Sequence, residues 1–236
     1  MNNAPESFPH KHTSFGRRKG KTLRSYHAGL MQSLLPKVEI DAEAVREHPM
    51  SLFPDRCKDL WLEIGFGSGE HLADDAARHR DIAFIGCEPF VNGVAKLLAH
   101  IDQERLDNIR VFAGDAREVI AALPQRSLAR VNILYPDPWP KTRQKKRRFI
   151  SDESLIALAH TMQTGAELRF ATDIDDYSAW TLGRILRSPH FDWRQRNSED
   201  WLTPWPFWPS TRYEAKALRE GRRPVYLTFV RNASSA

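Results

Sequence analysis

Acidic residues and glycines stand where three successive apolar segments of the sequence end. The acids are Glu63, Glu88 and Asp115, and the glycines after the first of them are Gly65, Gly67 and Gly69. Closely spaced glycines permit a tight turn in which the backbone approaches a ligand. A carboxylate after the second segment can accept both hydroxyls of a ribose, and one after the third can accept from an adenine amino group. The pattern predicts a site for an adenosine-containing ligand.

Glu70 stands where a dinucleotide-binding turn would have its third glycine. A carboxylate at that helix N-terminus would repel a pyrophosphate, which depends on backbone N–H donors and the helix dipole. The turn therefore favours a ligand without phosphates. S-adenosylmethionine is such a ligand, and its sulfonium cation suits the acidic residues nearby. The competing interpretation is that each acid only caps the helix that follows it.

A fourth acid, Asp137, lies between two prolines after another apolar segment, and a basic run follows it directly. Pro-Asp-Pro by itself is typical of a turn. At the carboxyl edge of a parallel strand, however, its carboxylate would face the substrate. The run at residues 141–148, KTRQKKRR, contains six cations and no acid. We expect these cations to bind phosphates of a nucleic acid beside the reaction centre.

The charge of the chain is unevenly distributed. The 236 residues carry a formal net charge of +5. The positive charge is concentrated in three stretches, residues 1–27, 141–148 and 212–223. Their summed net charge exceeds that of the whole chain, so the remaining residues are net acidic. This distribution predicts a polyanion bound at the edges and a neutral or cationic ligand bound in the middle.

Short β-type apolar segments alternate with helical segments from residue 58 onward, which predicts a doubly wound α/β domain with a mostly parallel sheet. Residues 1–28 are expected to form a flexible basic arm that binds RNA, and residues 29–236 a single domain. The tryptophan-rich segment 200–209 is expected to be a loop. The strands are expected at 59–65, 82–89, 108–115, 129–139, 167–174 and 224–231, and the helices at 71–79, 91–106, 116–123, 151–163 and 175–188.

Composition excludes several classes of protein. Two cysteines, Cys57 and Cys87, cannot form a disulfide framework or a cysteine-rich zinc site. The histidines form no ligand-like pair with nearby acids, so no metal is expected. The sequence contains neither a membrane-spanning apolar run nor the apolar core of a secretory signal. We expect a cytoplasmic protein that does not contact membranes.

Four sequence blocks resemble the bacterial tRNA (guanine-N7)-methyltransferases. They are LEIGFGSG, PDPWPKTRQKKRR, ATDIDDY and TRYEAK, and the basic leader SFGRRKGK is also similar. The resemblance implies a Rossmann-like class I methyltransferase fold with a seven-stranded sheet and S-adenosylmethionine as the cofactor. It also implies methyl transfer to N7 of a tRNA guanine, guanine 46 of the variable loop, to give 7-methylguanosine.

The resemblance also assigns site residues. It implies that S-adenosylmethionine contacts Glu63, Glu88, Asp115 and Asp137, the last of which is also the catalytic-site aspartate. It implies that the tRNA contacts Lys141, Asp173, Thr211, Arg212, Tyr213 and Glu214. Gln144 departs from the family pattern, which often has a histidine there, and this bears on any proton-transfer role at that position.

The chemistry of this reaction places limited demands on the protein. The N7 lone pair of guanine is unprotonated at neutral pH and can attack the methyl group in line, so no general base is needed. The protein must supply near-attack geometry and negative potential beside a purine that becomes cationic. We expect Asp137 to orient the reactants and to stabilise the developing positive charge.

Several alternatives remain open at this stage. Asp137-Pro138-Trp139 resembles the catalytic turn of exocyclic-amino methyltransferases but lacks their second proline, and a non-catalytic RNA-binding protein on the same fold is a further alternative. Glu214 either reads the guanine N1–H and N2–H groups or completes a helix capping box with Thr211. Asp173 either reads the base or caps the next helix. Aromatic residues of segment 200–209 either stack on nucleobases or pack under the sheet edge. A monomer and a homodimer are both compatible with the sequence, and no obligate protein partner is expected.

Overall fold

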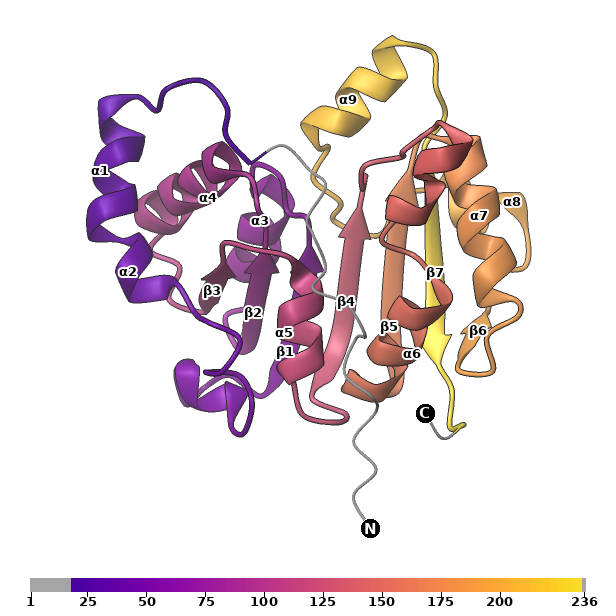
Figure 1. The fold of residues 1–236 in the computed structure, drawn as a ribbon, viewed down its shortest axis with the longest axis horizontal. Coiled ribbons are helices and arrows are strands. Elements are labelled where there is room, and N and C mark those ends of the chain that lie inside the picture. Colours follow the sequence, from indigo (N-terminus) through magenta and orange to yellow (C-terminus); the bar gives the residue numbers. More distant parts are fainter. Residues whose placement is uncertain (1–17, 235–236) are drawn as a thin grey trace.

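The computed structural model describes residues 18–234 (Figure 1). Residues 1–17, which make up most of the predicted arm, and residues 235–236 lie outside this described part. Within residues 18–234, seven strands form one sheet in the order β3-β2-β1-β4-β5-β7-β6. The strands are β1 Asp59–Ile64, β2 Ile82–Cys87, β3 Ile109–Phe112, β4 Leu128–Leu134, β5 Met162–Thr172, β6 Phe191–Trp193 and β7 Val225–Arg231.

The sheet is mixed, although most of it is parallel. Strands β1 to β5 run parallel, whereas β7 is antiparallel to both β5 and β6. Strand β1 has β2 on one side and β4 on the other, so the carboxyl ends of these parallel strands meet at one edge. The predicted doubly wound α/β fold is confirmed. Strand β6 has only three residues and was not among the predicted strands.

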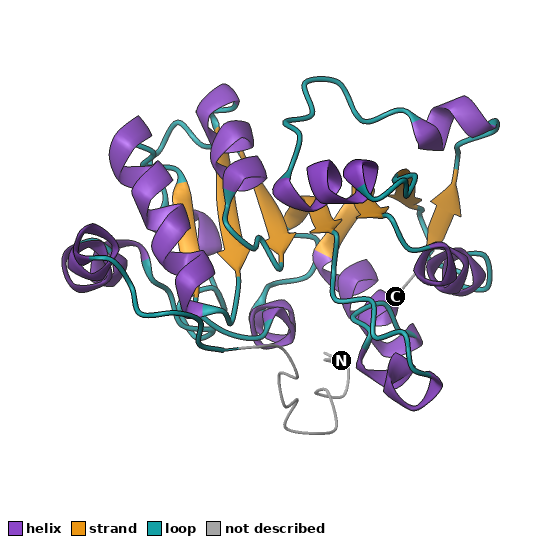
Figure 2. Ribbon diagram, turned by 90° about the horizontal axis from the view of Figure 1, so that it is seen from above, coloured by secondary structure: helices purple, strands orange, loops and turns teal. Residues whose placement is uncertain are grey.

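Helices cover both faces of the sheet (Figure 2). The α-helices are α1 Ser25–Ser33, α2 Leu35–Val38, α3 Glu70–Arg78, α4 Val91–Glu104, α5 Ala116–Ala122, α6 Asp152–Thr161, α7 Asp175–Ile185, α8 Ser198–Leu202 and α9 Arg212–Arg219. The 3₁₀-helices are η1 Pro49–Leu52 and η2 Thr142–Arg147. Helix α1 includes the last four residues assigned to the arm. Helix α8 replaces the beginning of the segment predicted as a loop.

Alternate residues of the central strands fill two cores, one on each face. Leu62 and Ile85 belong to the core that also contains apolar residues of α5 and α6. Trp61 and Phe84 belong to the core that contains residues of α3 and α4. This alternation follows from the two-residue period of a strand, and burial on both faces explains why the strands are almost continuously apolar. The sheet is therefore held rigidly between helical layers.

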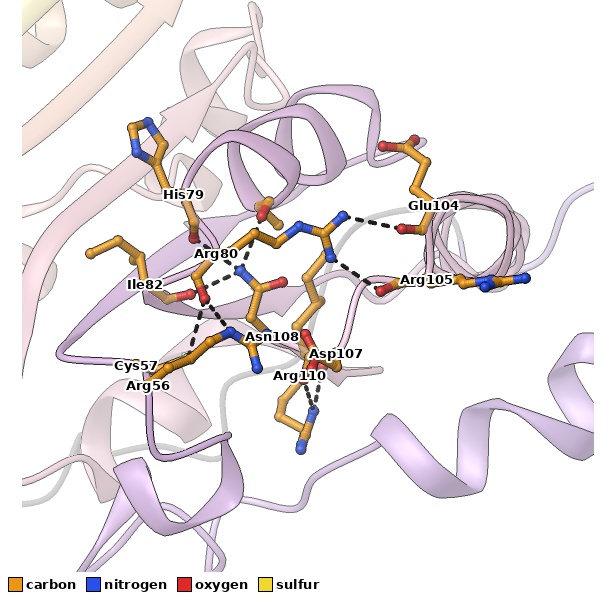
Figure 3. Close-up of polar contacts among 12 residues, drawn as sticks. Arg56, Cys57, His79, Arg80, Ile82, Glu104, Arg105, Asp107, Asn108 and Arg110 are labelled. Carbon is orange, nitrogen blue, oxygen red and sulfur yellow. Dashed lines mark hydrogen bonds and ion pairs between the residues drawn. The ribbon is translucent and has the colours of Figure 1, made fainter.

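A polar network closes the amino edge of the sheet (Figure 3). The fully buried Asn108 precedes β3 and donates its side-chain amide to the carbonyls of Ala76, His79 and Ile82, at 3.0–3.1 Å. Arg80 donates to the carbonyls of Glu104 and Arg105, both at 3.1 Å. These bonds hold the connections that lead into β2 and β3. The positions of these two strands are therefore fixed, and so are their carboxyl ends at the opposite edge of the sheet.

Among the helices of residues 18–234, none is both long and apolar enough to cross a membrane.

Candidate active site

A cavity of about 430 Å³ lies at the carboxyl edge of the sheet. Its walls come from the residues after β1, β2, β3 and β4 and from the first turn of α9, which Figure 1 shows beyond the end of β4. Of the residues predicted from the sequence, those that line it are Gly65, Gly67, Glu88, Asp115, Asp137, Arg212 and Tyr213. The topology thus brings together acids that are up to 49 positions apart in the sequence.

The glycine turn between β1 and α3 has the left-handed backbone that its sequence predicts. The φ angles of Gly65, Gly67 and Gly69 are +72°, +60° and +79°. A Cβ atom on Gly65 would meet nothing within 4 Å, so this position faces open space at the cavity wall. A Cβ atom on Gly69 would lie 2.7 Å from Leu97, so the third glycine allows α3 and α4 to pack. Gly65 therefore serves the cavity and Gly69 serves packing.

Glu88 links the end of β2 to the glycine turn. Its carboxylate accepts from the backbone N–H groups of Gly67, at 2.8 Å, and Phe90, at 2.9 Å. The residue is 8% exposed. Burial raises the pKa of Glu88, and the nearby charge of Asp137 adds to this effect, while the two N–H donors oppose it. Each oxygen keeps a lone pair for a ligand hydroxyl.

Asp115 both caps α5 and lines the cavity. One carboxylate oxygen accepts from the backbone N–H of Arg117 at 3.0 Å, and the other lies 3.1 Å from its guanidinium. The capping interpretation is therefore correct for this acid, but it does not exclude a ligand because the residue also faces the cavity.

Asp137 lies in a turn with an unusual backbone. Tyr135 and Trp139, on either side of it, have φ angles of +50° and +41°, which are uncommon for residues other than glycine. Asp137 is exposed at the cavity surface, but the surrounding protein limits hydration of its carboxylate, and this raises its pKa. Backbone strain at a site facing a cavity is typical of functional residues.

Arg148 fixes this turn from beneath. Its side chain is fully buried and donates to the Pro138 carbonyl at 2.8 Å and to the Asp176 carboxylate at 2.5 Å. The expectation that every cation of 141–148 faces phosphate is therefore wrong for Arg148. Lys145 also pairs with Asp176, at 2.6 Å.

The remaining cations of the basic run point outward or into the cavity. Lys141, Arg143 and Lys146 are exposed on and beside η2. Arg147 lies over the Trp139 ring and lines the cavity. Three exposed cations thus remain next to the Asp137 turn, and they suit a phosphate backbone.

Glu63 is placed behind the glycine turn rather than in the cavity wall. It is 3% exposed, and its carboxylate lies 2.6 Å from Nδ1 of the buried His71. Burial lowers the pKa of His71, but the charge and hydrogen bond of Glu63 and the charge of Asp75 outweigh that effect, so the pKa lies above its ordinary value. Glu63 and His71 therefore form a buried hydrogen-bonded pair.

The residues assigned to the substrate are divided between the cavity and its surroundings. Arg212 and Tyr213 line the cavity, and Arg212 also pairs with Glu70 at 2.9 Å. Lys141 is exposed outside the cavity. Asp173 pairs with Arg222 at 2.5 Å, and no side chain caps α7, so the capping interpretation of Asp173 is wrong.

Thr211 and Glu214 form only half of the predicted capping box. The Thr211 hydroxyl accepts from the backbone N–H of Glu214 at 3.2 Å and caps α9. The Glu214 carboxylate is instead held by the indole N–H of Trp208 and the hydroxyl of Tyr226. It is 5% exposed and lies outside the set of residues that line the cavity.

Comparisons with known proteins identify relatives of this chain. Residues 58–227 match a family model described as "Putative methyltransferase". A tRNA (guanine-N(7)-)-methyltransferase of Rhodopseudomonas palustris (strain BisB5) is 48% identical over 97% of this chain and 90% of its own. The protein of the same name from Bradyrhizobium diazoefficiens is also 48% identical, over 92% of this chain and 93% of its own.

This chain belongs to the tRNA (guanine-N7)-methyltransferase family. Solved structures agree on the fold. The 16S rRNA methyltransferase KamB covers 76% of this chain and 94% of its own, with a TM-score of 0.51 and 14% identity. A 16S rRNA (adenine(1408)-N(1))-methyltransferase from Catenulisporales acidiphilia also has a TM-score of 0.51, with 12% identity, and covers 77% of this chain and 88% of its own.

Several residues that line the cavity were not predicted from the sequence. Aromatic rings in the cavity wall suit the faces of purines, and they belong to Phe90, Tyr135, Trp139, Phe149 and Tyr213. Of these, only Tyr213 was assigned beforehand. The others adjoin predicted residues or follow the basic run, so proximity in sequence was the available signal.

Gly93 is a further residue that was not predicted from the sequence. A Cβ atom there would lie 2.1 Å from the carbonyl of Gly67 and 3.2 Å from Cγ of Glu88. The first turn of α4 therefore touches the glycine turn, and only a residue without a side chain permits this contact. Its position five residues after Glu88 was the only hint in the sequence.

The cavity fits S-adenosylmethionine, the cofactor of this enzyme family. The open space beside Gly65 admits a ligand close to the backbone. Glu88, Asp115 and Asp137 give the cavity negative charge, which suits a cationic ligand, and the rings suit an adenine. Within the described residues, no group of three or more His, Cys, Asp or Glu side chains is arranged to hold a metal ion.

Proposed function

We propose that this enzyme transfers a methyl group from S-adenosylmethionine to N7 of a guanine in tRNA, and that the target is guanine 46 of the variable loop. The observation that carries the proposal is a cavity that joins three acids to five aromatic rings, with exposed cations immediately outside it. The acids suit a cationic methyl donor, the rings suit two purines, and the cations suit the sugar-phosphate backbone.

The residues at the ends of β1, β2 and β3 would hold the cofactor, which supplies a methyl group activated by a sulfonium. The backbone of Gly65 and Gly67 allows close approach, and Glu88 accepts from the ribose hydroxyls. Asp115 accepts from the adenine amino group while remaining paired with Arg117. Glu63 does not line the cavity, and it would support the glycine turn through its hydrogen bond to His71.

Asp137 supports the reaction by its position and charge. Guanine N7 offers its lone pair without losing a proton, so no residue has to act as a general base. The purine gains positive charge as the methyl group arrives, and a nearby carboxylate stabilises that charge. The Asp137 turn is held by Arg148 through the Pro138 carbonyl, so the carboxylate is oriented before substrate arrives.

The substrate side of the cavity is formed by the first turn of α9, whereas Asp173, after β5, lies outside the lining. Tyr213 and Arg212 line the cavity and would contact the base or its phosphate. Thr211 holds the first turn of α9 in place. Asp173 and Glu214 each carry a carboxylate that can accept from guanine N1–H and N2–H. Each already has a partner in this structure, so base recognition requires a local rearrangement there.

RNA binding extends from the cavity to the exposed cations Lys141, Arg143 and Lys146. A base in tRNA tertiary structure has to be pulled out at a cost of about a few kcal/mol, and phosphate contacts next to the cavity help to offset that cost. The basic arm would add further contacts from residues 1–28. We place the enzyme in the cytoplasm because its substrate is tRNA, and we expect it to act as a monomer or homodimer without an obligate protein partner.

Methylation of tRNA transcripts tests the target position. A transcript with guanine 46 should accept labelled methyl groups, and a transcript with adenine at that position should not. A control transcript that has another variable-loop guanine replaced should remain a substrate. Equal labelling of all three transcripts would contradict guanine 46 as the target.

A further inference from the structure

Glu214 is held by side chains from two other parts of the chain. Its Oε2 atom accepts from the indole N–H of Trp208 at 2.7 Å, and its Oε1 atom accepts from the hydroxyl of Tyr226. Trp208 belongs to the segment between α8 and α9, and Tyr226 belongs to β7. The carboxylate is therefore fixed relative to the sheet and not only to its own helix.

The two donors are themselves packed in place. The Trp208 ring lies 4.8 Å from the His71 ring and 5.3 Å from the Trp205 ring, centre to centre. The Tyr226 ring lies 5.5 Å from Trp205 and 5.7 Å from Trp208. Burial of Tyr226 and its hydrogen bond to Glu214 raise the pKa of its phenol, which keeps it a donor at neutral pH. The donors therefore have little freedom to turn away from the carboxylate.

The aromatic cluster of Trp205, Trp208 and Tyr226 contacts residues next to the glycine turn and next to the Asp137 turn. His71 bonds to Glu63 behind the glycine turn, and Tyr135, which begins the Asp137 turn, packs against the buried Tyr226. A buried carboxylate with no donors would cost considerable free energy, and the two hydrogen bonds supply donors to both Glu214 oxygens. An oriented carboxylate is what recognition of guanine N1–H and N2–H needs.

We propose that Trp208 and Tyr226 are positioning residues that orient Glu214 for recognition of the guanine edge, with His71 supporting the indole from behind. The inference rests on the proposed function, because it takes Glu214 as a group that reads the base. Each Glu214 oxygen accepts one hydrogen bond from the cluster and keeps a lone pair for the base. The carboxylate is 5% exposed, so contact with the base requires a local rearrangement that leaves both donor bonds in place.

Discrimination between guanine and hypoxanthine tests this role directly. A tRNA transcript with inosine at the target position keeps N7 and N1–H but lacks the 2-amino group. If Glu214 accepts from that amino group, wild-type kcat/KM should favour guanine by about ten- to a hundredfold, as expected for one hydrogen bond to a charged acceptor. Glu214→Gln should reduce this preference. A Glu214→Gln enzyme with the wild-type preference would overturn the inference, while tRNA methylation by the wild type would still support the function.

The positioning variants then remove one donor each. Trp208→Phe keeps an aromatic ring beside His71 but removes the indole N–H, and Tyr226→Phe removes only the hydroxyl. Each should lower the preference for guanine by about three- to tenfold, and neither should lower it further in a Glu214→Gln background. S-adenosylmethionine affinity, measured by calorimetry, should stay within about twofold of the wild type.

Trp205→Phe is the matched control, since the Trp205 indole donates to Thr228 at 2.8 Å and not to Glu214. Trp205→Phe disturbs the same aromatic cluster but leaves both hydrogen bonds to Glu214 in place. The preference of this variant for guanine should therefore equal that of the wild type. The inference would be overturned if Trp208→Phe and Tyr226→Phe kept the wild-type preference. It would also be overturned if Trp205→Phe lowered the preference as much as they do, because the effect would then come from packing alone.

Discussion

The two edges of the sheet are both rich in polar residues, but they use them differently. At the amino edge, the Asn108 amide donates to three carbonyls and Arg80 donates to two, all within the chain. At the carboxyl edge, Asp137 and Glu88 face a cavity of about 430 Å³. The Glu88 carboxylate accepts from two backbone N–H groups and still has lone pairs that can accept from a ligand. The first edge holds the fold together, and the second is arranged for a ligand.

Because of this difference, substitutions at the amino edge should affect stability, and substitutions at the carboxyl edge should affect activity. Polar groups that are paired within the chain stabilise the folded state, so their loss should be seen in unfolding. Carboxylates that face a cavity are less hydrated than in water, and the protein supplies too few hydrogen-bond donors to compensate. This destabilises the charged form and raises the pKa values of Glu88 and Asp137. Their loss should be seen in catalysis.

The largest effect is expected at the carboxyl edge. Asp137→Asn should lower kcat by about 10²–10³-fold, because the amide keeps the shape of the side chain but removes the charge that stabilises the methylated purine. Its melting temperature should equal or slightly exceed that of the wild type. Single-turnover methylation with saturating tRNA measures this loss, and an Asn variant with near wild-type kcat would remove Asp137 from the reaction.

The pH dependence sharpens the same comparison. The raised pKa of Asp137 means that its carboxylate takes up a proton at a higher pH than an ordinary aspartate. Because the charged form is needed, wild-type kcat should fall as the pH falls through this pKa. The residual activity of Asp137→Asn should lack that acid limb, and an identical limb in both enzymes would assign it to another group, such as Glu88.

The amino edge should respond in the opposite way. Asn108→Ala removes three hydrogen bonds and should lower the free energy of unfolding by about 1–3 kcal/mol, since buried carbonyls lose their donor. Its kcat at 25 °C should match the wild type. Denaturant titration and steady-state kinetics on the same preparation provide the test, and a loss of kcat without a loss of stability would break the division between the edges.

A smaller effect is expected where a helix touches the glycine turn. Gly93→Ala places a methyl group against the Gly67 carbonyl and should weaken S-adenosylmethionine binding by about tenfold, because the turn has to shift. Gly29→Ala is the matched control. An added methyl group at Gly29 in α1 would meet nothing within 4 Å, so alanine should stabilise the helix by roughly 0.5–1 kcal/mol and leave binding unchanged. Calorimetry distinguishes the two.

The smallest effect concerns the exposed cations. The Arg143→Ala, Lys146→Ala double variant should flatten the dependence of log binding constant on log salt by about 0.7–0.9 for each phosphate that is no longer neutralised. Its melting temperature should not change. Arg148→Met should lower the melting temperature, because this arginine is buried and bonded to Pro138 and Asp176. An unchanged salt slope in the double variant would exclude both cations from the RNA interface.

The parts of the structure that depend on neighbouring residues were predictable from the sequence. Gly65 and Gly67 indicate a turn because few other residues adopt positive φ, and the apolar strands indicate a sheet because they are buried on both faces. The strand ends then place Glu88 and Asp137 at one edge. These features are local, or they follow from the handedness of parallel βαβ units.

Features that depend on distant partners could not be predicted in this way. Arg148 reads as one more cation of a basic run, and only Asp176, 28 positions away, and the aromatic rings around it account for its burial. Glu214 has the spacing of a capping box, yet its carboxylate turns toward Trp208 and Tyr226. Strand β6 is three residues long, which is too short for a periodic pattern.

Nucleoside analysis of tRNA methylated by the purified enzyme tests the central claim most directly. Unmodified tRNA is incubated with labelled S-adenosylmethionine, digested to nucleosides and separated by chromatography, with the Asp137→Asn enzyme in parallel. The account predicts label in 7-methylguanosine with the wild type and a strongly reduced amount with the variant. Label in N6-methyladenosine or N2-methylguanosine, or no label in the tRNA at all, would contradict it.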